Sequence, residues 1–411
     1  NSVKCYFTQN SRPASLIFMI DLFRMPRFLR ERWDMTKRDA GMLALFLSGH
    51  HPPPLVPLNT VPAQHALVTP RALRVLEVRR ETADALTLVL HDPAGLPIPC
   101  LPGQFFTVLV AQNGKLLRRA YSASHYVEDA MQLHLTCKRI AGGQVSTHLH
   151  EYAHPGMMLQ VLGPSGQFAI TPKPDCKRRI VLLGGGSGIT PLHCMLTAVL
   201  AVEKESSVTL LFGNQRKQDI IFLDHLQELA AQHPKRFTLR HVLAEPDASL
   251  DAVPGILDQS TISAILGSLP QDDGTVQYYL CGPQGMMDAA RATLLQNGVS
   301  PSRIHEEKFA TPQLASRSLS SAPQVVELTH KGRSQTVQVE PEETILEAGL
   351  RSGIDLPFSC TMGGCGACKG KLVDGDVDLP EPNCLTPKER EDRQVLLCVA
   401  HPAKRCRIEV P

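Results

Sequence analysis

The sequence has 411 residues, of which 43% are hydrophobic and 5% aromatic, and its formal net charge is +2. A nearly neutral chain with few aromatic residues lacks the positive field and the stacking surface of a nucleic-acid-binding protein, so nucleic acid is not expected as a partner. The length exceeds what one hydrophobic core usually organises and predicts two or three domains.

The first 67 residues are expected to form an N-terminal extension that ends in a proline-rich linker. Residues 20–47 combine large apolar side chains with several arginines, a composition that could place a basic amphipathic helix on a membrane surface. An extension without a fixed fold is the favoured alternative. Prolines at residues 52–54 exclude a helix or an inner strand there. No apolar run has the length of a membrane span or of a signal peptide, so we expect a cytoplasmic location.

Residues 68–173 show short β-like runs separated by turn residues, which predicts a small antiparallel β-barrel. The expected strands cover residues 72–79, 86–90, 105–110, 131–136 and 158–161.

Residues 174–311 alternate strands with helical segments, and this βαβ rhythm predicts a parallel α/β sheet. The expected strands cover residues 179–183, 208–212 and 277–280, with helices after residue 191 and near residues 222–232. A serine-rich stretch at residues 312–323 is typical of a linker, which leaves residues 324–411 as a separate small domain. The expected fold class is therefore a multidomain protein with α/β and β domains.

A glycine-rich loop follows the first strand of the α/β segment. Residues 184–191 read Gly-Gly-Gly-Ser-Gly-Ile-Thr-Pro, so that a strand, a glycine turn and a helix start occur in succession, and the helix N-terminus can meet a pyrophosphate. A glycine run alone is a weak sign. However, Tyr-Leu-Cys-Gly-Pro at residues 279–283 follows another strand, at the sheet edge where open α/β folds bind ligands. The predicted nucleotide-binding residues are Gly184, Gly185, Gly186, Ser187, Gly188, Thr190, Arg216, Cys281, Gly282 and Pro283.

This pair of motifs resembles the ferredoxin–NADP reductase superfamily, which implies that the glycine loop binds a pyridine dinucleotide and that Cys281 lies beside the nicotinamide. The family's R-x-Y-S flavin motif matches residues 119–122. The resemblance implies that Arg119 pairs with a flavin phosphate, that Tyr121 packs along the isoalloxazine, and that Ser122 faces flavin N5. Ser122 and Cys281 are thus the expected catalytic residues. Arginine suits a phosphate because its fork donates two N–H bonds at a fixed spacing.

A second motif and one aromatic residue complete the implied flavin site. Residues 142–146, Gly-Gly-Gln-Val-Ser, match the family's second flavin motif, which implies that the amides of Gly142 and Gly143 and the hydroxyl of Ser146 contact phosphate at a helix start. Phe309 stands where relatives have an aromatic ring near the flavin, and packing in the core of a terminal strand is the alternative. The motif favours FAD over FMN, although FMN reductases with the same three domains exist.

The sequence leaves two candidates for the nicotinamide donor, NADPH and NADH. Arg216 and Lys217 follow the strand at residues 208–212 and offer cations to an adenosine 2′-phosphate, whereas no acidic residue stands where a ribose 2′-hydroxyl would be bound. Asp219 lies close by but later in the chain. These residues favour NADPH, with NADH as the alternative and an ordinary surface Arg-Lys pair as the simplest explanation.

Four cysteines near the C-terminus have the spacing of an iron–sulfur site. Cys360, Cys365, Cys368 and Cys398 form C-x4-C-x2-C followed by 29 residues and the last cysteine, as in plant-type [2Fe-2S] ferredoxins. Glycines in the loop allow it to fold closely and direct N–H groups at the sulfurs. A zinc site is the alternative, but it usually pairs two short-spaced cysteine motifs. Residues 324–411 resemble plant-type ferredoxins throughout, which implies a β-grasp domain that carries one electron.

The three segments together resemble the reductase components of multicomponent oxygenases, including the phenylacetyl-CoA oxygenase and phthalate dioxygenase reductase groups. The resemblance covers residues 68–411 and implies an oxidoreductase that moves electrons from NAD(P)H through FAD and a [2Fe-2S] cluster to an oxygenase, hydroxylase or desaturase. A reductase of a hybrid-cluster protein or of another redox protein shares these domains and is the first alternative. A non-catalytic electron-carrier module is the second, and the intact Arg119, Ser122 and Cys281 argue against it.

Overall fold

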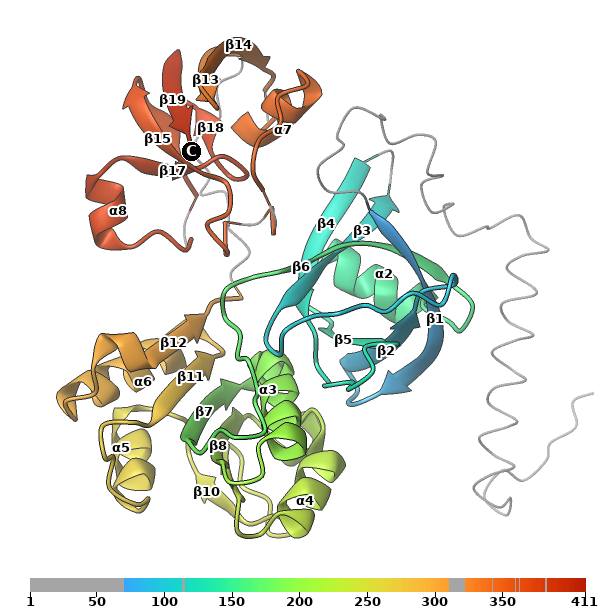
Figure 1. The fold of residues 1–411 in the computed structure, drawn as a ribbon, viewed down its shortest axis with the longest axis vertical. Coiled ribbons are helices and arrows are strands. Elements are labelled where there is room, and N and C mark those ends of the chain that lie inside the picture. Colours follow the sequence, from blue (N-terminus) through green and yellow to red (C-terminus); the bar gives the residue numbers. More distant parts are fainter. Residues whose placement is uncertain are drawn as a thin grey trace, which may run out of the picture. The chain divides into compact units, whose positions relative to one another are not determined.

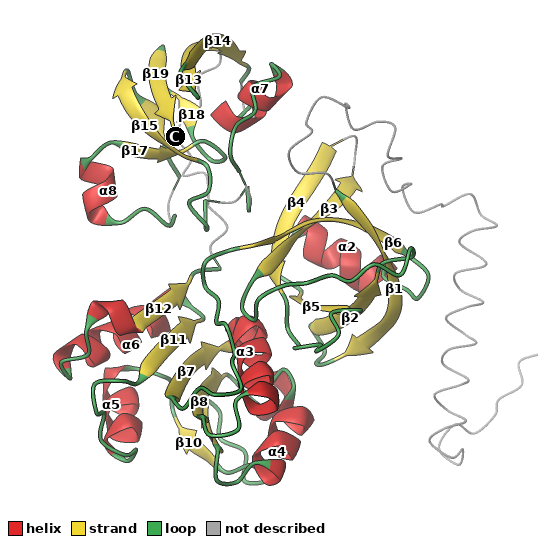
Figure 2. Cartoon of the chain, viewed as in Figure 1, coloured by secondary structure: helices red, strands yellow, loops and turns green. Residues whose placement is uncertain are grey.

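The structure is a computed structural model, and it describes residues 70–112, 115–309, 322–341, 343–358, 360–361, 363–380 and 383–411. The expected N-terminal extension, its possible membrane-surface helix and residues 312–321 of the expected linker lie outside the described residues. Figures 1 and 2 show the described helices and strands, which belong to three sheet-containing regions of the chain. No helix among the described residues is both long and apolar enough to cross a membrane.

The first region is a six-stranded antiparallel sheet with strand order β4-β3-β6-β1-β2-β5. Leucine, valine and phenylalanine side chains of these strands form one buried core, and helix α2 contributes Val145 and Leu149 to it. A single isolated bridge, Ala123 with Leu135, joins the segment after β4 to β5. The expected closed barrel is therefore not confirmed in the described residues. The elements are β1 (Arg71–Arg80), β2 (Ala85–His91), β3 (Phe105–Gln112), β4 (Lys115–Ser122), β5 (Leu133–Lys138), α2 (Gln144–Tyr152) and β6 (Met158–Ser165).

The second region is a parallel six-stranded sheet with strand order β10-β9-β8-β7-β11-β12. The chain runs outward from β7 to β10 and then returns to place β11 on the other side of β7. Open α/β sheets bind ligands at such a reversal. The strands are β7 (Arg179–Gly185), β8 (Ser207–Asn214), β9 (Phe237–Leu243), β10 (Ala252–Pro254), β11 (Gln277–Cys281) and β12 (Ile304–Glu307).

Helices cover both faces of this parallel sheet (Figure 2), and each face has its own apolar core. Residues of α3 and α4 pack into one core, and residues of α5 and α6 pack into the other. Burial on both faces explains why β7 is a nearly continuous apolar run. The helices are η3 (Gly186–Gly188), α3 (Ile189–Val202), η4 (Lys217–Asp219), α4 (Leu223–Gln232), α5 (Gln259–Gly267), α6 (Gln284–Gln296) and η5 (Pro301–Arg303).

Helix α3 also contacts the antiparallel sheet. The thiol-bearing side chain of Cys194 belongs to the core of that sheet, and the backbone N–H of Tyr126 donates a hydrogen bond to Thr197 Oγ1 at 3.3 Å. The helix that follows the glycine loop is thus packed against the region that carries the expected flavin motifs.

The third region is a mixed five-stranded sheet with strand order β14-β13-β19-β15-β17, in which β13 and β19 are parallel. Capping boxes begin both of its helices, with Thr344 and Glu347 at α7 and Thr386 and Glu389 at α8. The elements are β13 (Gln324–His330), β14 (Arg333–Val339), α7 (Ile345–Arg351), β15 (Lys369–Asp374), β16 (Val377–Asp378), α8 (Pro387–Glu391), β17 (Gln394–Leu396), β18 (His401–Pro402) and β19 (Cys406–Val410).

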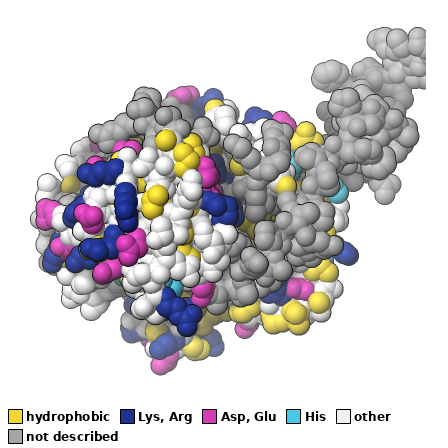
Figure 3. Space-filling model, turned by 90° about the horizontal axis from the view of Figure 1, so that it is seen from above, with side chains coloured by type: hydrophobic (Ala, Val, Ile, Leu, Met, Phe, Trp, Pro, Cys, Tyr) yellow, Lys and Arg dark blue, Asp and Glu magenta, His cyan; other side chains and the backbone are white. Residues whose placement is uncertain are grey.

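Basic and acidic side chains are interspersed on the face of the molecule shown in Figure 3. This mixing agrees with the sequence, which contains 42 lysines and arginines against 40 aspartates and glutamates.

Candidate functional site

The glycine loop and the Cys-Gly-Pro segment lie side by side at the carboxyl edge of the parallel sheet. Strand β11 pairs with β7 so that Cys281 is opposite Gly184. A Cβ atom on Gly188 would overlap the carbonyl group of Cys281, and one on Gly185 would lie 2.6 Å from Pro283 Cδ. Only glycine therefore permits this close packing, which brings the two expected nucleotide-binding motifs together.

The start of α3 has the features of an anion site. No side chain caps α3 or the turn η3 that leads into it. The first amide of α3, that of Ile189, donates to the carbonyls of Gly186 and Ser187, so the amides that could meet an anion are those of the glycine loop and of the residues after Ile189. Thr190 is buried and its hydroxyl donates to the Ser187 carbonyl at 3.1 Å, which holds the loop against the first turn. Gly186 has a φ of +52°, a conformation that glycine adopts without strain.

Arg216 follows β8 at the same edge of the sheet, but its guanidinium already has a partner. Nε and Nη2 donate to the Asp219 carboxylate at 3.0 and 3.3 Å. The expected 2′-phosphate would have to replace this carboxylate. Sequence reasoning missed the pairing, although the three-residue spacing of Arg216 and Asp219 was a usable signal.

Ser122 ends β4 and lies buried, with 2% of its surface exposed. Its Oγ donates a hydrogen bond to Oε2 of Glu307 at 3.2 Å. Glu307 is the last residue of β12 and lies opposite Cys281 in the pairing of β11 with β12. The two expected catalytic residues, Ser122 and Cys281, are thus brought together around Glu307.

Burial affects the protonation of both Glu307 and Cys281. It raises the pKa of Glu307 to about 8, against an opposing effect of the Ser122 hydroxyl, which donates to the carboxylate. Burial likewise raises the pKa of the Cys281 thiol well above its usual range. Both groups are therefore predominantly neutral at pH 7. Ser122 and Cys281 were expected at this place, whereas Glu307 was not among the predicted site residues.

The expected phosphate-binding residues of the flavin site lie on β4 and at the start of α2. Arg119 donates from Nη1 to the backbone carbonyl of Arg118 at 2.7 Å, and no carboxylate in the described part of the chain forms an ion pair with it. Gly143 is the N-cap of α2, which has no side-chain cap, and Gly142 has a φ of +72°. Ser146 Oγ accepts from the Ile140 amide at 3.2 Å and keeps its own proton to donate. These donors suit a phosphate.

Tyr121 and Phe309 differ in exposure. Tyr121 is half-buried, and burial raises the pKa of its phenol well above the usual range, so the ring is a neutral, largely apolar surface. Phe309 has 44% of its surface exposed, which does not fit the alternative that it fills the core of a terminal strand. An exposed ring two residues after Glu307 is available to cover a bound ligand.

The four expected cluster ligands converge. Sulfur contacts link Cys365 to Cys360, Cys360 to Cys398, and Cys398 to Cys368. The backbone N–H of Gly363 donates to Cys398 Sγ at 3.3 Å, and another loop amide donates to Cys360 Sγ at 3.4 Å. Amides directed at sulfur suit a cluster of thiolate ligands.

Two further cysteines of this region lie outside the spacing. Cys384 is half-buried and Cys406 is buried in β19, and burial raises the pKa of each thiol to about 11. Neither residue belongs to the C-x4-C-x2-C motif or is its distant fourth cysteine, so both are interpreted as bystanders.

Three protein-family models match the chain in the expected order. They are the oxidoreductase FAD-binding domain over residues 73–170, the oxidoreductase NAD-binding domain over residues 182–292, and the 2Fe-2S iron-sulfur cluster binding domain over residues 328–403. The last match favours an iron–sulfur cluster over the zinc alternative.

Curated relatives include components of oxygenase systems. One subunit of the 1,2-phenylacetyl-CoA epoxidase of Escherichia coli (strain K12) is 32% identical over 82% of this chain and 96% of its own length. The ferredoxin reductase component of the 3-ketosteroid-9-alpha-monooxygenase of Mycolicibacterium smegmatis is 33% identical over 80% of this chain and 94% of its own.

Solved structures show the same fold. The structure of phthalate dioxygenase reductase matches with a TM-score of 0.61 at 21% identity, over 83% of this chain and 98% of that one. An intact type IV self-sufficient cytochrome P450 monooxygenase matches with a TM-score of 0.58 at 23% identity, and this chain spans 41% of its length. With three matched domains and relatives above 30% identity, the chain belongs to the ferredoxin–NADP reductase superfamily, among the oxidoreductases that combine FAD-, NAD- and 2Fe-2S-binding domains as reductase components of oxygenase systems.

Proposed function

We propose that this chain takes electrons from NADPH at the group formed by Ser122, Glu307 and Cys281, and passes them through FAD and a [2Fe-2S] cluster to a separate oxygenase. The observation that carries the proposal is the convergence of two motifs far apart in the sequence. The end of the flavin motif, Ser122, and the end of the nucleotide strand, Cys281, both lie beside Glu307. A hydride donor and a flavin must meet at such a place.

The residues that would bind the phosphates of the two cofactors lie in different segments of the chain. Arg119 and the amides and hydroxyl at the start of α2, from Gly142, Gly143 and Ser146, would hold the FAD pyrophosphate. The loop at residues 184–188 and the uncapped start of α3 would hold the dinucleotide pyrophosphate. A flavin supplies the link between a two-electron donor and a one-electron acceptor, because it exchanges electrons singly or in pairs.

Residues around the reacting centre would position it and exclude water. Ser122 would present its hydroxyl to the flavin, while the neutral Glu307 behind it avoids placing a charge there. The buried thiol of Cys281 would provide a compact, uncharged wall beside the nicotinamide. Tyr121 and Phe309 would cover the two sides of the flavin ring.

The cluster would be held by Cys360, Cys365, Cys368 and Cys398, and its acceptor would be an oxygenase, hydroxylase or desaturase. The relatives support this acceptor class, because their names describe part of an epoxidase and a monooxygenase reductase component. A reductase of another redox protein, such as a hybrid-cluster protein, uses the same electron path and differs only in the acceptor.

Three finer assignments belong to the same proposal. The antiparallel sheet would close as a barrel through the Ala123–Leu135 bridge, and the mixed sheet with α7 would be a β-grasp domain. The proposed domain bounds are residues 68–173, 174–311 and 324–411. FAD is preferred over FMN because the matching family model is an FAD-binding domain.

The acceptor is tested by reconstitution. The purified chain with NADPH is combined in turn with the oxygenase components of a phenylacetyl-CoA epoxidase and of a 3-ketosteroid monooxygenase, and oxygenated product is measured. Product with either component, absent when Cys365→Ser replaces the wild type, supports an oxygenase acceptor. Active cytochrome c reduction without product from either component would count against these two oxygenase classes and in favour of another redox partner.

A further inference from the structure

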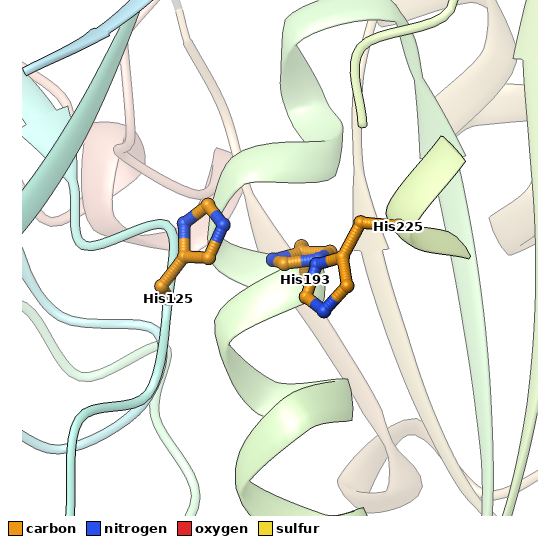
Figure 4. Close-up of side chains that lie close together, drawn as sticks. All are labelled: His125, His193 and His225. Atoms are coloured by element: carbon orange, nitrogen blue, oxygen red, sulfur yellow. The ribbon is translucent and has the colours of Figure 1, made fainter. Parts of the chain in front are cut away.

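Three histidines from separate parts of the sequence meet next to the packing contact between α3 and the antiparallel sheet. His125 follows β4, His193 lies on α3 and His225 lies on α4 (Figure 4). Each offers one ring nitrogen, and these nitrogens all lie within 4.8 Å of one another. His193 Nε2 and His225 Nδ1 are 2.9 Å apart. None of the three is used in the proposed electron path.

One histidine of this trio is oriented in the way that metal-ligating histidines are. His193 is fully buried, and its Nδ1–H donates to the backbone carbonyl of Ser124 at 2.6 Å. This hydrogen bond fixes the tautomer, so that Nε2 presents a lone pair toward the other two rings. Ser124 is itself held in place, because its Oγ donates to the His134 carbonyl at 3.1 Å.

The surroundings keep the imidazoles neutral. Burial lowers the pKa of His193 to about 3 and also lowers the pKa values of His125 and His225. The ring of Phe222 packs against two of them, with centroids 4.4 Å from His193 and 5.0 Å from His125. Neutral imidazoles with a lone pair are the ligands that Zn²⁺ and similar ions take from histidine.

The ordinary explanation is a hydrogen-bonded histidine pair with a third ring packed on it. A hydrogen bond from His225 to His193 would satisfy the 2.9 Å contact without any ion. His125 has a partner of its own in that explanation, because its Nδ1 contacts Ser124 Oγ at 3.1 Å. Its ring also lies 4.5 Å from that of His193 and is parallel to that of His225 within 4°. Hydrogen bonds thus account for each ring separately, whereas a metal site accounts for the convergence of three ring nitrogens within 4.8 Å.

We propose that His125, His193 and His225 form a binding site for a divalent transition-metal ion such as Zn²⁺, with water at the fourth position. Zinc–nitrogen bonds of about 2.0–2.1 Å place tetrahedral ligands about 3.4 Å apart. The present separations, 2.9 Å between His193 Nε2 and His225 Nδ1 and at most 4.8 Å within the trio, lie on either side of that spacing. The ion would tie the segment that follows the flavin motif to α3 and α4.

The test uses the full-length protein with flavin and cluster intact. Zn²⁺ binding is measured by titration calorimetry, and the ligands are read from the zinc K-edge X-ray absorption spectrum, which is blind to the iron of the cluster. We expect one Zn²⁺ per chain with nitrogen ligands near about 2.0 Å, rather than sulfur near about 2.3 Å. Spurious binding to cysteines would thus be recognised directly.

The matched variants are His225→Gln and His154→Gln. His225 is half-buried, so its replacement by glutamine is tolerated better than that of the buried His193. His154 is exposed and its Nδ1 contacts only the neighbouring Pro155 carbonyl, at 2.9 Å. We expect His225→Gln to weaken Zn²⁺ binding by at least about tenfold and His154→Gln to leave it unchanged.

Two results would overturn the metal site. One is the absence of stoichiometric Zn²⁺ binding to the wild type, and the other is binding that survives His225→Gln or shows sulfur ligands. Flavin content and ferricyanide reduction, measured on both variants, verify that each is folded. The outcome does not depend on the proposed electron path, because neither residue belongs to it.

Discussion

The hydroxyl of Ser122 donates to the carboxyl group of Glu307 across 3.2 Å, and this contact joins two residues that are 185 positions apart in the sequence. Ser122 ends the strand that carries the flavin motif, and Glu307 ends the last strand of the parallel sheet. The contact places the flavin motif at the edge where the nucleotide motifs meet.

Replacing Ser122 by alanine should slow hydride transfer. The variant removes the hydroxyl that is proposed to face the flavin, so we expect kcat for NADPH-dependent ferricyanide reduction to fall at least about tenfold, with little change in KM. Ser300→Ala is the control, because Ser300 is exposed and its hydroxyl contacts only Ser302 Oγ, at 2.9 Å. Equal kcat values for the two variants would show that the Ser122 hydroxyl has no role in hydride transfer.

Glu307 should make the stability of the protein depend on pH. Burial raises the pKa of its carboxyl group from 4.5 to about 8, so the folded protein keeps this proton while the unfolded chain loses it. The folded state therefore binds more protons between these two values, and stability decreases as pH rises through this window. The loss is absent below pH 4.5 and complete above about pH 8.

Glu307→Gln removes the titrating group and should remove this effect. We expect the thermal midpoints of wild type and variant to be close at pH 5, and the variant to be more stable by several degrees at pH 9. The measurement is thermal unfolding of the flavin-loaded protein across this range. A difference between the two proteins that does not change with pH would mean that the carboxyl group is already ionised in the folded state.

Arg216 should determine the preference between the two nicotinamide donors. If its guanidinium binds the 2′-phosphate, Arg216→Ala should lower the ratio of kcat/KM for NADPH to that for NADH by about tenfold, the worth of one charge-assisted hydrogen bond. Asp219→Asn should change the ratio in the opposite direction, because the carboxylate competes for the same guanidinium at 3.0 Å. Arg333→Ala, an exposed arginine of β14, is the control. If the ratio is unchanged in both the Arg216 and the Asp219 variants, Arg216 does not bind the 2′-phosphate of NADPH.

Cys365→Ser should separate the two halves of the electron path. Serine at this position removes one of four sulfur ligands, so cytochrome c reduction should be lost while ferricyanide, which takes electrons directly from the flavin, is still reduced. Cys384→Ser should retain both activities, since Cys384 is interpreted as a bystander. Loss of both activities in Cys365→Ser would indicate that the cluster only supports the fold.

The sequence predicted those features that depend on local pattern. Strands at residues 86–90, 105–110 and 179–183 lie inside β2, β3 and β7, because alternating or continuous apolar runs record burial on one or both faces. Strand β4 was not expected as a strand, since the basic pair Arg118 and Arg119 interrupts its apolar pattern. The closing of the barrel depends on pairing between distant strands, which no local pattern specifies.

For the candidate site, the sequence likewise predicted individual residues, but it did not predict how these residues are arranged in space. Spacing identified the four cysteines, and motif order identified Arg119, Ser122 and Cys281 as candidates. The raised pKa of Glu307 and its contact with Ser122 could not be predicted, because both arise from packing between segments that are distant in sequence. The histidine trio depends likewise on tertiary packing, since its members come from the segment after β4, from α3 and from α4.

The central claim is that one chain holds a flavin and a [2Fe-2S] cluster in electronic contact with a nicotinamide donor. An anaerobic titration of the purified protein with NADPH, and separately with NADH, followed by visible absorption, tests it most directly. We expect flavin absorption near ~450 nm and a broad iron–sulfur shoulder to bleach together. We expect this to need a smaller amount of NADPH than of NADH. A spectrum without the shoulder, or one that neither nucleotide bleaches, would contradict the proposed electron path.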